Sequence, residues 1–316
     1  MRVRLPSCAP GGAMDFFLNE SRGRRRFKDL LGQANHLIVT SLVGLDGVER
    51  GLVTTPPLDL HAAWSPKDPI ISARRARRLL LDMVLVRAVD SVDVYIRAVR
   101  QQPSLIQIPV LRNRIDGAGR SVLQKVMALE DHYGSADPVI FAMVLTMVAW
   151  RNKGVHEDAD TRIEDRFGEI LRSNASTIAD QYRGLDVVRL LNGFQSSEPT
   201  FKEVASLISA AQEFVVTLER LLFRDLDKVQ YLRELIWQVP EEASGDAAQR
   251  FRKRRMQSIW GRDPSDRTAA VLRLLREFGI TDVRRYGEAA IFPALLVGDL
   301  SKFTPSKVYD WANPPR

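Results

Sequence analysis

Apolar residues recur every three or four positions through most of the chain, and runs that alternate apolar and polar residues are scarce. The first spacing is that of one face of an α-helix, whereas strict alternation would indicate a half-buried strand. The pattern therefore predicts an all-α protein, with long helices packed side by side in a bundle. We expect helices over 27–42, 72–100, 119–133, from 138 onward, over 163–185 and over 200–237.

Local signals fix some of these helix starts. Asp137 is a good N-cap, and Pro138 suits the first helical position because its missing N–H costs nothing there. Ser72 is the expected cap of the helix over 72–100, and Ser121 lies near the start of the helix over 119–133. The helix that begins at Pro138 contains the most apolar run of the chain, and we expect it in the core.

The segment VPEEASGDAAQ, residues 239–249, is small and polar, which indicates a joint between domains. In the part that follows, Gly279 should stop a helix over 266–278, Thr281 or Asp282 can cap another, and Thr304 should open a last short one. The predicted organisation is a disordered extension over 1–26, a helical domain over 27–238, a linker with a basic helix over 239–265 and a small helical domain over 266–316.

The charge of the chain points to an anionic partner. Its net charge is +7, its pI is about 9.7, and much of the excess falls in the runs RGRRR (22–26), RRARR (74–78) and RFRKRR (250–255). For any single run, a solvated helix face is the simpler explanation. The candidate nucleic-acid contacts are Arg74, Arg75, Arg78, Lys153, Arg252, Lys253, Arg254 and Arg255.

Cys8 is the single cysteine, so an internal disulfide and a multi-thiolate zinc site are excluded, and a reducing cytoplasmic location is expected. The first 13 residues lack the apolar segment of a signal peptide. The apolar run over 139–150 is about half as long as the roughly 20 residues that a membrane span needs. We therefore expect no membrane association.

Two stretches resemble functional motifs, but each is better explained as ordinary structure. RIDGAGRSVLQ, residues 114–124, resembles the end of a phosphate-binding loop but lacks its first glycine and its lysine, and it follows no strand. HEDAD, residues 156–160, could ligate a metal, but acidic residues there are better explained as the start of the next helix. We therefore expect neither a cofactor nor a metal.

The stretch AWRNKGVHED, residues 149–158, combines Arg151, Asn152 and His156 at the end of the apolar helix. On an unbroken helix Arg151 and His156 would project about 140° apart. A left-handed Gly154 would end the helix and let His156 fold back beside the arginine. Guanidinium binds phosphate oxygens, and imidazole exchanges protons near neutral pH, so the trio suits phosphodiester cleavage without a metal. Alternatively, Arg151 and His156 simply satisfy the carbonyl end of the helix.

The pattern Arg151-Asn152-Lys153-Gly154-Val155-His156 resembles the Arg-polar-x(3–5)-His signature of the HEPN superfamily, and the helix over 74–99 is similar to the helix that precedes it there. The similarity covers roughly residues 27–237. HEPN proteins are helical bundles, and many are metal-independent endoribonucleases of toxin–antitoxin and antiviral systems. The resemblance implies that Arg151 stabilises the scissile phosphate, that His156 is general acid or base, and that Asn152 positions one of these partners.

The resemblance further implies RNA as the substrate, a homodimer with a composite site, and an antitoxin or another defence-system protein as a partner. One subgroup of the family carries a tyrosine two residues after the histidine, which a partner enzyme modifies, whereas this chain has Asp158. The alternative hypothesis is a non-catalytic HEPN-like scaffold or nucleic-acid-binding regulator. It rests on the basic runs and on a helix-turn-helix interpretation of the C-terminal helices.

Overall fold

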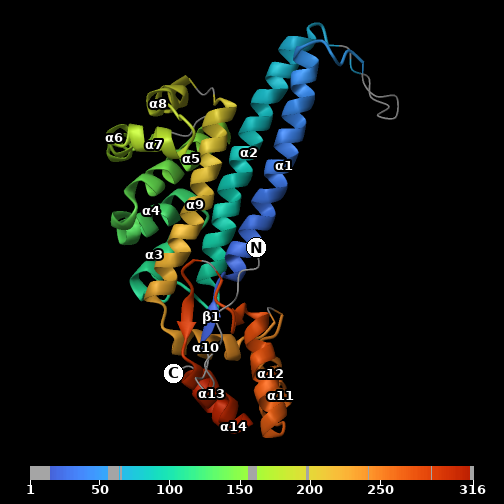
Figure 1. Ribbon diagram of the computed structural model, residues 1–316, viewed down its shortest axis with the longest axis vertical. Coiled ribbons are helices and arrows are strands. Elements are labelled where there is room, and N and C mark those ends of the chain that lie inside the picture. Colours follow the sequence, from blue (N-terminus) through green and yellow to red (C-terminus); the bar gives the residue numbers. More distant parts are fainter. Residues whose placement is uncertain are drawn as a thin grey trace, which may run out of the picture. The chain divides into compact units, whose positions relative to one another are not determined.

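The structure, a computed structural model, describes residues 15–55, 64, 66–155, 162–196, 199–240, 242–285 and 287–313. These residues form fourteen α-helices and one small sheet, so the predicted all-α class is confirmed (Figure 1). Among them, no helix combines the length and the apolar character needed to cross a membrane. The chain divides into a helical unit, 23–98 with 108–218, and a small-sheet unit, which joins the described part of 1–22 to 99–107 and 219–316.

Two long helices, α1 (Arg22–Glu49) and α2 (Pro69–Arg100), run antiparallel as a hairpin in the helical unit (Figure 1). Near one end of the hairpin the rings of Phe27 and Tyr95 meet edge to face, with centroids 6.4 Å apart, and both side chains are buried. Near the other end Arg77 Nε donates to Glu49 Oε1 at 3.1 Å. The hairpin is therefore joined by an apolar contact at its base and by an ion pair further along.

The core of the helical unit forms around α5, which packs against α4 and α6. Phe141 of α5 also meets Phe214 of α9 edge to face, with ring centroids 5.2 Å apart. Besides α1 and α2, this part of the chain contains α3 (Pro109–Gly117), α4 (Val122–Tyr133), the 3-10 helix η2 (Gly134–Ala136), α5 (Pro138–Val155), α6 (Asp165–Ser173), α7 (Ala175–Gln181), α8 (Val187–Ser196) and α9 (Phe201–Asp225).

The predicted starts of α4 and α5 are confirmed, and that of α2 is wrong. Ser121 Oγ accepts from the N–H of Gln124 at 3.3 Å, and Asp137 Oδ1 accepts from the N–H of Ile140 at 3.1 Å. By contrast, α2 begins at Pro69, and the side chain of Asp68 accepts from the N–H of Ile71 at 3.0 Å. An aspartate followed by proline is the same start signal as at α5 and takes the place expected of Ser72.

The two helices predicted over 163–185 and 200–237 are both broken. The first becomes α6 and α7, and it ends where Arg183 and Gly184 take left-handed φ angles of 53° and 80°. Lys202 Nζ donates to the carbonyl of Arg183 at 2.7 Å, which satisfies a group at that helix end. The second becomes α9 and α10 (Lys228–Trp237), because the side chain of Asp227 caps a new helix start.

A three-stranded antiparallel sheet in the order β2-β1-β3 lies in the small-sheet unit. Its central strand, β1 (Phe16–Leu18), pairs Leu18 with Ile280 of β2 (Ile280–Thr281) and with Ala290 of β3 (Ala290–Phe292). The prediction of a disordered extension is therefore wrong over residues 15–26, which form β1 and the start of α1; residues 1–14 lie outside the described part. Likewise, Thr281 ends a strand instead of capping a helix.

The helices of the small-sheet unit surround buried aromatic side chains. Trp260 is buried, and its Nε1 donates to the carbonyl of Leu300 at 2.9 Å. Thr304 caps the last helix as predicted, by accepting from the N–H of Lys307 at 3.2 Å. The chain does not divide near 239–249 as expected, because β1 and 99–107 belong with the C-terminal residues. These helices are α10, α11 (Gly245–Trp260), α12 (Pro264–Glu277), α13 (Ala294–Lys302) and α14 (Pro305–Ala312).

Candidate functional site

Helix α5 brings Arg151 and Asn152 to the edge of the helical unit. Every residue from Ile140 to Trp150 is buried, so the helix is apolar on all sides and is held in the core. A helix that is apolar all round is stabilised by packing on every face, which fixes the direction in which it ends. The last turn then presents Arg151 and Asn152, which are both partly buried.

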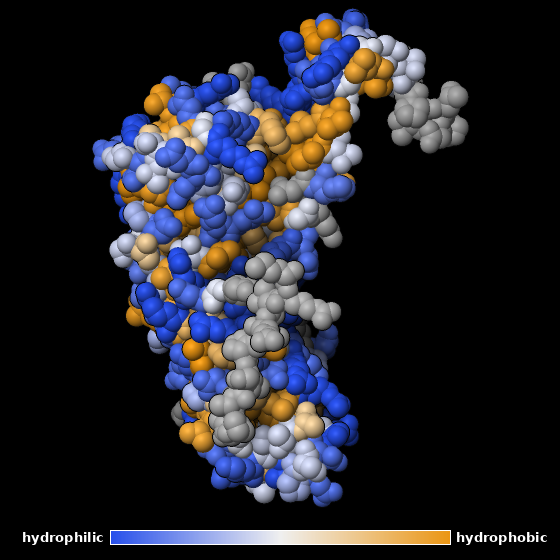
Figure 2. Space-filling view, in the orientation of Figure 1, coloured by the Kyte–Doolittle hydropathy of each residue, from blue (hydrophilic) through white to orange (hydrophobic). Residues whose placement is uncertain are grey.

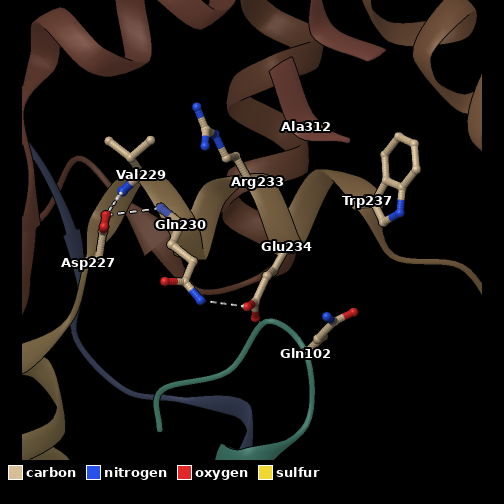
Figure 3. Close-up of a pocket in the computed structure, with 8 residues that line it drawn as sticks. All are labelled: Gln102, Asp227, Val229, Gln230, Arg233, Glu234, Trp237 and Ala312. Atoms are coloured by element: carbon tan, nitrogen blue, oxygen red, sulfur yellow. Dashed lines mark hydrogen bonds between the residues drawn. The ribbon is translucent and has the colours of Figure 1, made fainter. Parts of the chain in front are cut away.

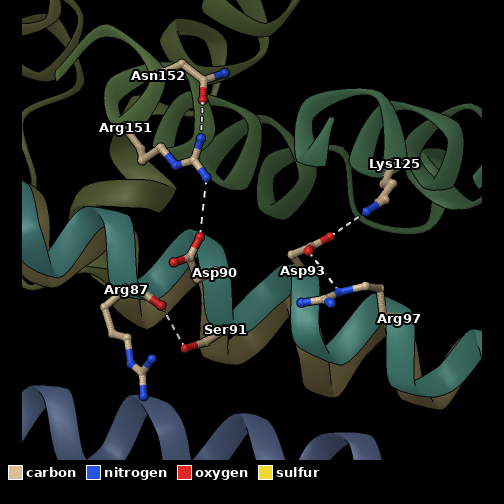
Figure 4. Close-up of polar contacts among 8 residues, drawn as sticks. All are labelled: Arg87, Asp90, Ser91, Asp93, Arg97, Lys125, Arg151 and Asn152. Carbon is tan, nitrogen blue, oxygen red and sulfur yellow. Dashed lines mark hydrogen bonds and ion pairs between the residues drawn. The ribbon is translucent and has the colours of Figure 1, made fainter. Parts of the chain in front are cut away.

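The guanidinium of Arg151 is oriented by two oxygen atoms (Figure 4). Nη1 donates to Oδ1 of Asn152 at 3.0 Å, and Nη2 donates to Oδ1 of Asp90 on α2 at 3.3 Å. One fifth of the Arg151 side chain remains exposed (20%), and half of Asp90 (51%). Within the described residues, the buried Nε of Arg151 has no hydrogen-bond partner. Arg151 is therefore positioned from two helices and retains unused donors.

The predicted role of Gly154 is wrong. Helix α5 continues through Gly154 to Val155, and Gly154 is not among the glycines with positive φ. The helix thus ends about where expected, at Val155, but without a left-handed glycine in its last turn. A glycine costs a helix less near its end, where fewer intrahelical bonds depend on it, so the stop signal was not decisive. His156 lies outside the described residues, and its convergence with Arg151 stays a prediction.

Asp82 of α2 lies close to the same helix end. Its Oδ1 is 3.8 Å from the point where a Cβ on Gly154 would lie. Burial raises the pKa of the Asp82 carboxyl above its ordinary value, and the neighbouring charge of Arg78 opposes this to a smaller extent. Two carboxylates of α2 therefore lie near the last turns of α5: Asp90, which pairs with Arg151, and Asp82, which is beside Gly154.

Comparisons of the chain with protein-family models, with curated proteins and with solved structures find no match. The resemblance to HEPN proteins therefore rests on the sequence, through the spacing of Arg151, Asn152 and His156 and the helix over 74–99.

Lys153 turns to another side of α5, toward α8. Its Nζ donates to the carbonyl of Phe194 at 2.6 Å and lies 4.8 Å from the centre of the Phe194 ring. Phe194 in turn packs edge to face against Trp150, with centroids 5.7 Å apart. Together with Arg162 and Arg172, Lys153 lines a cavity of about 370 Å³ between the end of α5, α6 and α8.

The sequence missed Arg162 and Arg172 as members of this site. They stand singly in the chain, outside the three basic runs. No local pattern relates Arg172 at the end of one helix to Lys153 at the end of another. The helical spacing of Phe167 and Leu171 indicates that these two residues lie on the buried face of the helix. It does not place Arg172 on that face, and it says nothing about a contact with Lys153.

The basic run on α2 is exposed at the residues expected to bind nucleic acid. Arg74, Arg75 and Arg78 are all exposed, whereas the intervening Arg77 is bonded to Glu49. Three cations at positions i, i+1 and i+4 spread over about one helical turn. This surface remains a candidate for contact with a polyanion.

The basic run on α11 is divided between two roles. Arg252 Nε donates to the carbonyl of Trp237 at 2.9 Å, and its guanidinium lies 4.4 Å from the centre of a Trp237 ring. Arg255 Nη1 donates to the carbonyl of Gln238 at 3.2 Å, and burial lowers the pKa of its guanidinium. Both arginines thus hold α11 to the end of α10. Arg250, Lys253 and Arg254 are the exposed cations of this run.

A second cavity, of about 390 Å³, lies beside α10 in the small-sheet unit (Figure 3). Its acidic residues are already used by the fold. Asp227 caps α10, while Glu234 accepts from Nε2 of Gln230 at 3.1 Å and from the N–H of Ser104 at 2.7 Å. Both carboxylates that line this cavity are therefore already hydrogen-bonded within the fold.

No group of three or more histidine, cysteine, aspartate or glutamate side chains placed to hold a metal ion occurs in the described parts of the chain. The HEDAD stretch, residues 156–160, lies outside the described residues. The candidate site offers a guanidinium, an amide and, by sequence, an imidazole. These groups bind phosphate oxygens and transfer protons.

Proposed function

We propose that this protein is a metal-independent endoribonuclease of HEPN type that serves as a toxin or in antiviral defence. The observation that carries the proposal is the placement of Arg151. Its guanidinium lies at the end of the buried helix α5, is oriented by Asp90 and Asn152, and remains partly exposed. His156 follows five residues later in the chain.

In the proposed reaction, His156 takes the proton from a ribose 2′-hydroxyl, and the oxygen attacks the adjacent phosphorus. The bond from phosphorus to the 5′-oxygen breaks, and that oxygen takes up a proton. The products are a 2′,3′-cyclic phosphate and a 5′-hydroxyl end. Arg151 stabilises the negative charge that builds on the phosphate oxygens, and Asn152 orients Arg151. DNA lacks the 2′-hydroxyl, so the mechanism selects RNA without reading bases.

The decisive experiment is cleavage of RNA in EDTA by the wild type and by the Arg151→Ala and His156→Ala variants. Loss of a general acid or base lowers the rate by about 10²- to 10⁴-fold, so both variants should fall by at least that factor while they remain folded. Arg120→Ala, which removes an exposed arginine of the same unit, is the matched control. Equal cleavage by all four proteins would overturn the proposal.

A non-catalytic scaffold or nucleic-acid-binding regulator is the second candidate. The ion pair between Arg151 and Asp90 favours it, because a paired guanidinium can serve the packing of α5 on α2 alone. In that case RNA or DNA binds in a salt-dependent manner, turnover is absent, and His156→Ala leaves binding unchanged. The cleavage assay together with a binding measurement separates the two functions.

The proposed nuclease acts as a homodimer in which two copies contribute to one cleft. The α1–α2 hairpin offers an apolar surface for this pairing (Figure 2). Leu79 and Met83 of α2 are 62% and 60% exposed. They lie within three residues of Asp82, whose carboxyl is beside Gly154. A second copy seated there would lie close to Arg151. The other exposed apolar side chains of the hairpin are Leu37, Val39, Val43, Leu52, Val53, Ile70 and Ile71.

Sedimentation analysis tests this pairing. The wild type should sediment as a dimer, and Met83→Glu should sediment as a monomer, because a buried unpaired carboxylate opposes association. The exposed Leu295→Glu, in the small-sheet unit, is the control and should remain dimeric. A monomeric wild type would contradict the composite site.

A toxic nuclease needs restraint, and Asp158 replaces the tyrosine through which some family members are silenced. We therefore propose that an antitoxin or another defence-system protein restrains this one by binding it. Co-expression with the products of neighbouring genes, scored by host growth, tests this part of the proposal.

A further inference from the structure

The cavity between α5, α6 and α8 gathers positive charge from three separate segments of the helical unit. Lys153 reaches it from the last turn of α5, Arg162 from the residues before α6, and Arg172 from the end of α6. Asp165 is the one carboxylate among the lining residues. Three cations and one anion give the cavity a net charge of about +2, so it attracts anions.

Two of these cations are held in place. Lys153 is fixed by its hydrogen bond to the carbonyl of Phe194 and by its position over the Phe194 ring. The guanidinium of Arg172 lies against Gly168, four residues earlier on α6, with Nη1 3.3 Å from the point where a Cβ would lie. Glycine at this position leaves room for the arginine to lie flat along its helix. Within the described chain, the Arg172 guanidinium forms no hydrogen bond or ion pair, while the Arg172 carbonyl accepts from the N–H of Asn174.

The chemistry of the lining selects the kind of anion. Guanidinium groups bind phosphate through paired N–H donors, and a lysine adds a point charge. The amide of Asn192 also lines the cavity and supplies a further polar group. A volume of about 370 Å³ lies in the range of small-molecule sites, roughly 300–1,000 Å³, and exceeds what a bare inorganic ion needs. A phosphate that belongs to a larger molecule fits this combination.

The cavity lies next to the candidate active site along α5. Lys153 and Arg151 are two residues apart, so their side chains project about 160° apart with a rise of about 3 Å. Arg151 accordingly faces Asp90 of α2, and Lys153 faces Phe194 of α8. A strand that passes around the end of α5 meets both positive groups in succession.

We propose that this cavity binds a phosphate of the RNA strand other than the one that is cleaved, with Lys153, Arg162 and Arg172 as its ligands. The proposal rests on the function proposed above and adds a second phosphate subsite to it. Arg172 binds this phosphate directly, and Gly168 allows the arginine to reach it.

Binding of a short single-stranded RNA with 2′-O-methyl groups tests the subsite, because that RNA cannot be cleaved by 2′-hydroxyl attack. Fluorescence anisotropy gives the Kd of the wild type, of Arg172→Gln and of Arg120→Gln, an exposed arginine outside the cavity. We expect Arg172→Gln to raise the Kd about tenfold, as for one charge-assisted hydrogen bond, and Arg120→Gln to leave it nearly unchanged. The slope of log Kd against log salt should fall by about 0.7 in Arg172→Gln.

Gly168→Ala provides a second variant that keeps every charge. The added methyl displaces the Arg172 guanidinium, so RNA binding should weaken while the helical content, measured by circular dichroism, stays the same. Equal effects of Arg172→Gln and Arg120→Gln, or no effect of either, would overturn the subsite. Inorganic phosphate is tested as a competitor. Phosphate binding that depends on Arg172, combined with RNA binding that does not, would overturn the assignment to RNA.

The subsite and the nuclease proposal fail in different ways. If the wild type binds the RNA through Arg172 but cleaves no RNA, the subsite stands and the nuclease does not. If cleavage depends on His156 while Arg172→Gln leaves both the Kd and the KM unchanged, the nuclease stands and the subsite does not.

Discussion

At the scale of single residues, Asp93 of α2 holds two cations (Figure 4). Its Oδ1 accepts from Nζ of Lys125 at 2.7 Å, and its Oδ2 pairs with Arg97 at 3.0 Å. The Lys125 side chain is 5% exposed, so loss of Asp93 would leave a buried ammonium without its counter-charge. We expect Asp93→Ala to lower the free energy of unfolding by about 3–5 kcal/mol, measured by urea denaturation.

Arg97→Ala is the matched control, because it breaks an exposed pair of the same aspartate. Such i,i+4 pairs contribute about 0.2–0.5 kcal/mol, so this variant should be nearly as stable as the wild type. If Asp93→Ala lowered the free energy of unfolding by as little as Arg97→Ala does, the buried pair of Asp93 and Lys125 would contribute little to stability.

The carboxyl of Asp82 gives a prediction about pH. Burial raises its pKa in the folded protein above the ordinary 3.8, so the folded state keeps this proton at a pH where the unfolded chain has lost it. Below pH 3.8 the Asp82 carboxyl is protonated in both the folded and the unfolded state, so it does not lower the free energy of unfolding. As the pH rises from 3.8 through the raised pKa, the free energy of unfolding falls, and the loss then stays constant.

Asp82→Asn removes this ionisation. As the pH rises from 3.8 through the raised pKa, the free energy of unfolding of the variant should therefore increase relative to that of the wild type. Urea denaturation at a series of pH values measures the difference. A difference between the two proteins that stays constant with pH would contradict the role of burial at this site.

At the scale of elements, the sequence predicts two helices from a start signal of adjacent residues, whereas the same signal at Asp68 and Pro69 was missed. Asp137 with Pro138 and Thr304 with Pro305 both place a capping side chain directly before a proline, and both helices begin there. The breaks inside the predicted helices depend both on the residues at the break and on side chains that are distant in the sequence. Gly184 could have indicated one of them, since glycine accepts positive φ. Lys202, however, which donates to the carbonyl of Arg183 at that helix end, lies 19 residues after Arg183.

The last turn of α5 provides a prediction about an element. Gly154 has helical geometry, and the nearest atom to an added Cβ would be Asp82 Oδ1 at an ordinary 3.8 Å. Gly154→Ala should therefore raise the free energy of unfolding by up to about 1 kcal/mol, measured by chemical denaturation, since alanine favours the helix. Gly279→Ala is the control: with φ of 84°, it should lower stability. If Gly154→Ala lowered the free energy of unfolding, the result would support the left-handed conformation of Gly154 that the sequence indicated.

At the scale of the whole molecule, the candidate site was only partly predictable. Arg151 and Asn152 lie where the apolar run placed them, because one helix carries both the core residues and the polar end. Asp90, by contrast, is 61 residues from Arg151, and no local pattern pairs them. The same holds for β1, whose partners lie more than 260 residues away. Strands of two or three residues are too short for alternation to reveal them.

The division of the chain into two units leads to the last prediction. Leu18 in the small-sheet unit and Leu129 in the helical unit are both fully buried, at 0% exposure. Removing either side chain to alanine should cost about 2–5 kcal/mol in the unit that contains it. Hydrogen exchange reports local unfolding, so Leu18→Ala should speed exchange in α10–α14 and Leu129→Ala in α3–α6. Leu18 comes from a segment that the sequence indicated as disordered, and its effect should nevertheless reach helices more than 200 residues away in the chain. Uniform acceleration of exchange by both variants would show that the two units unfold as one.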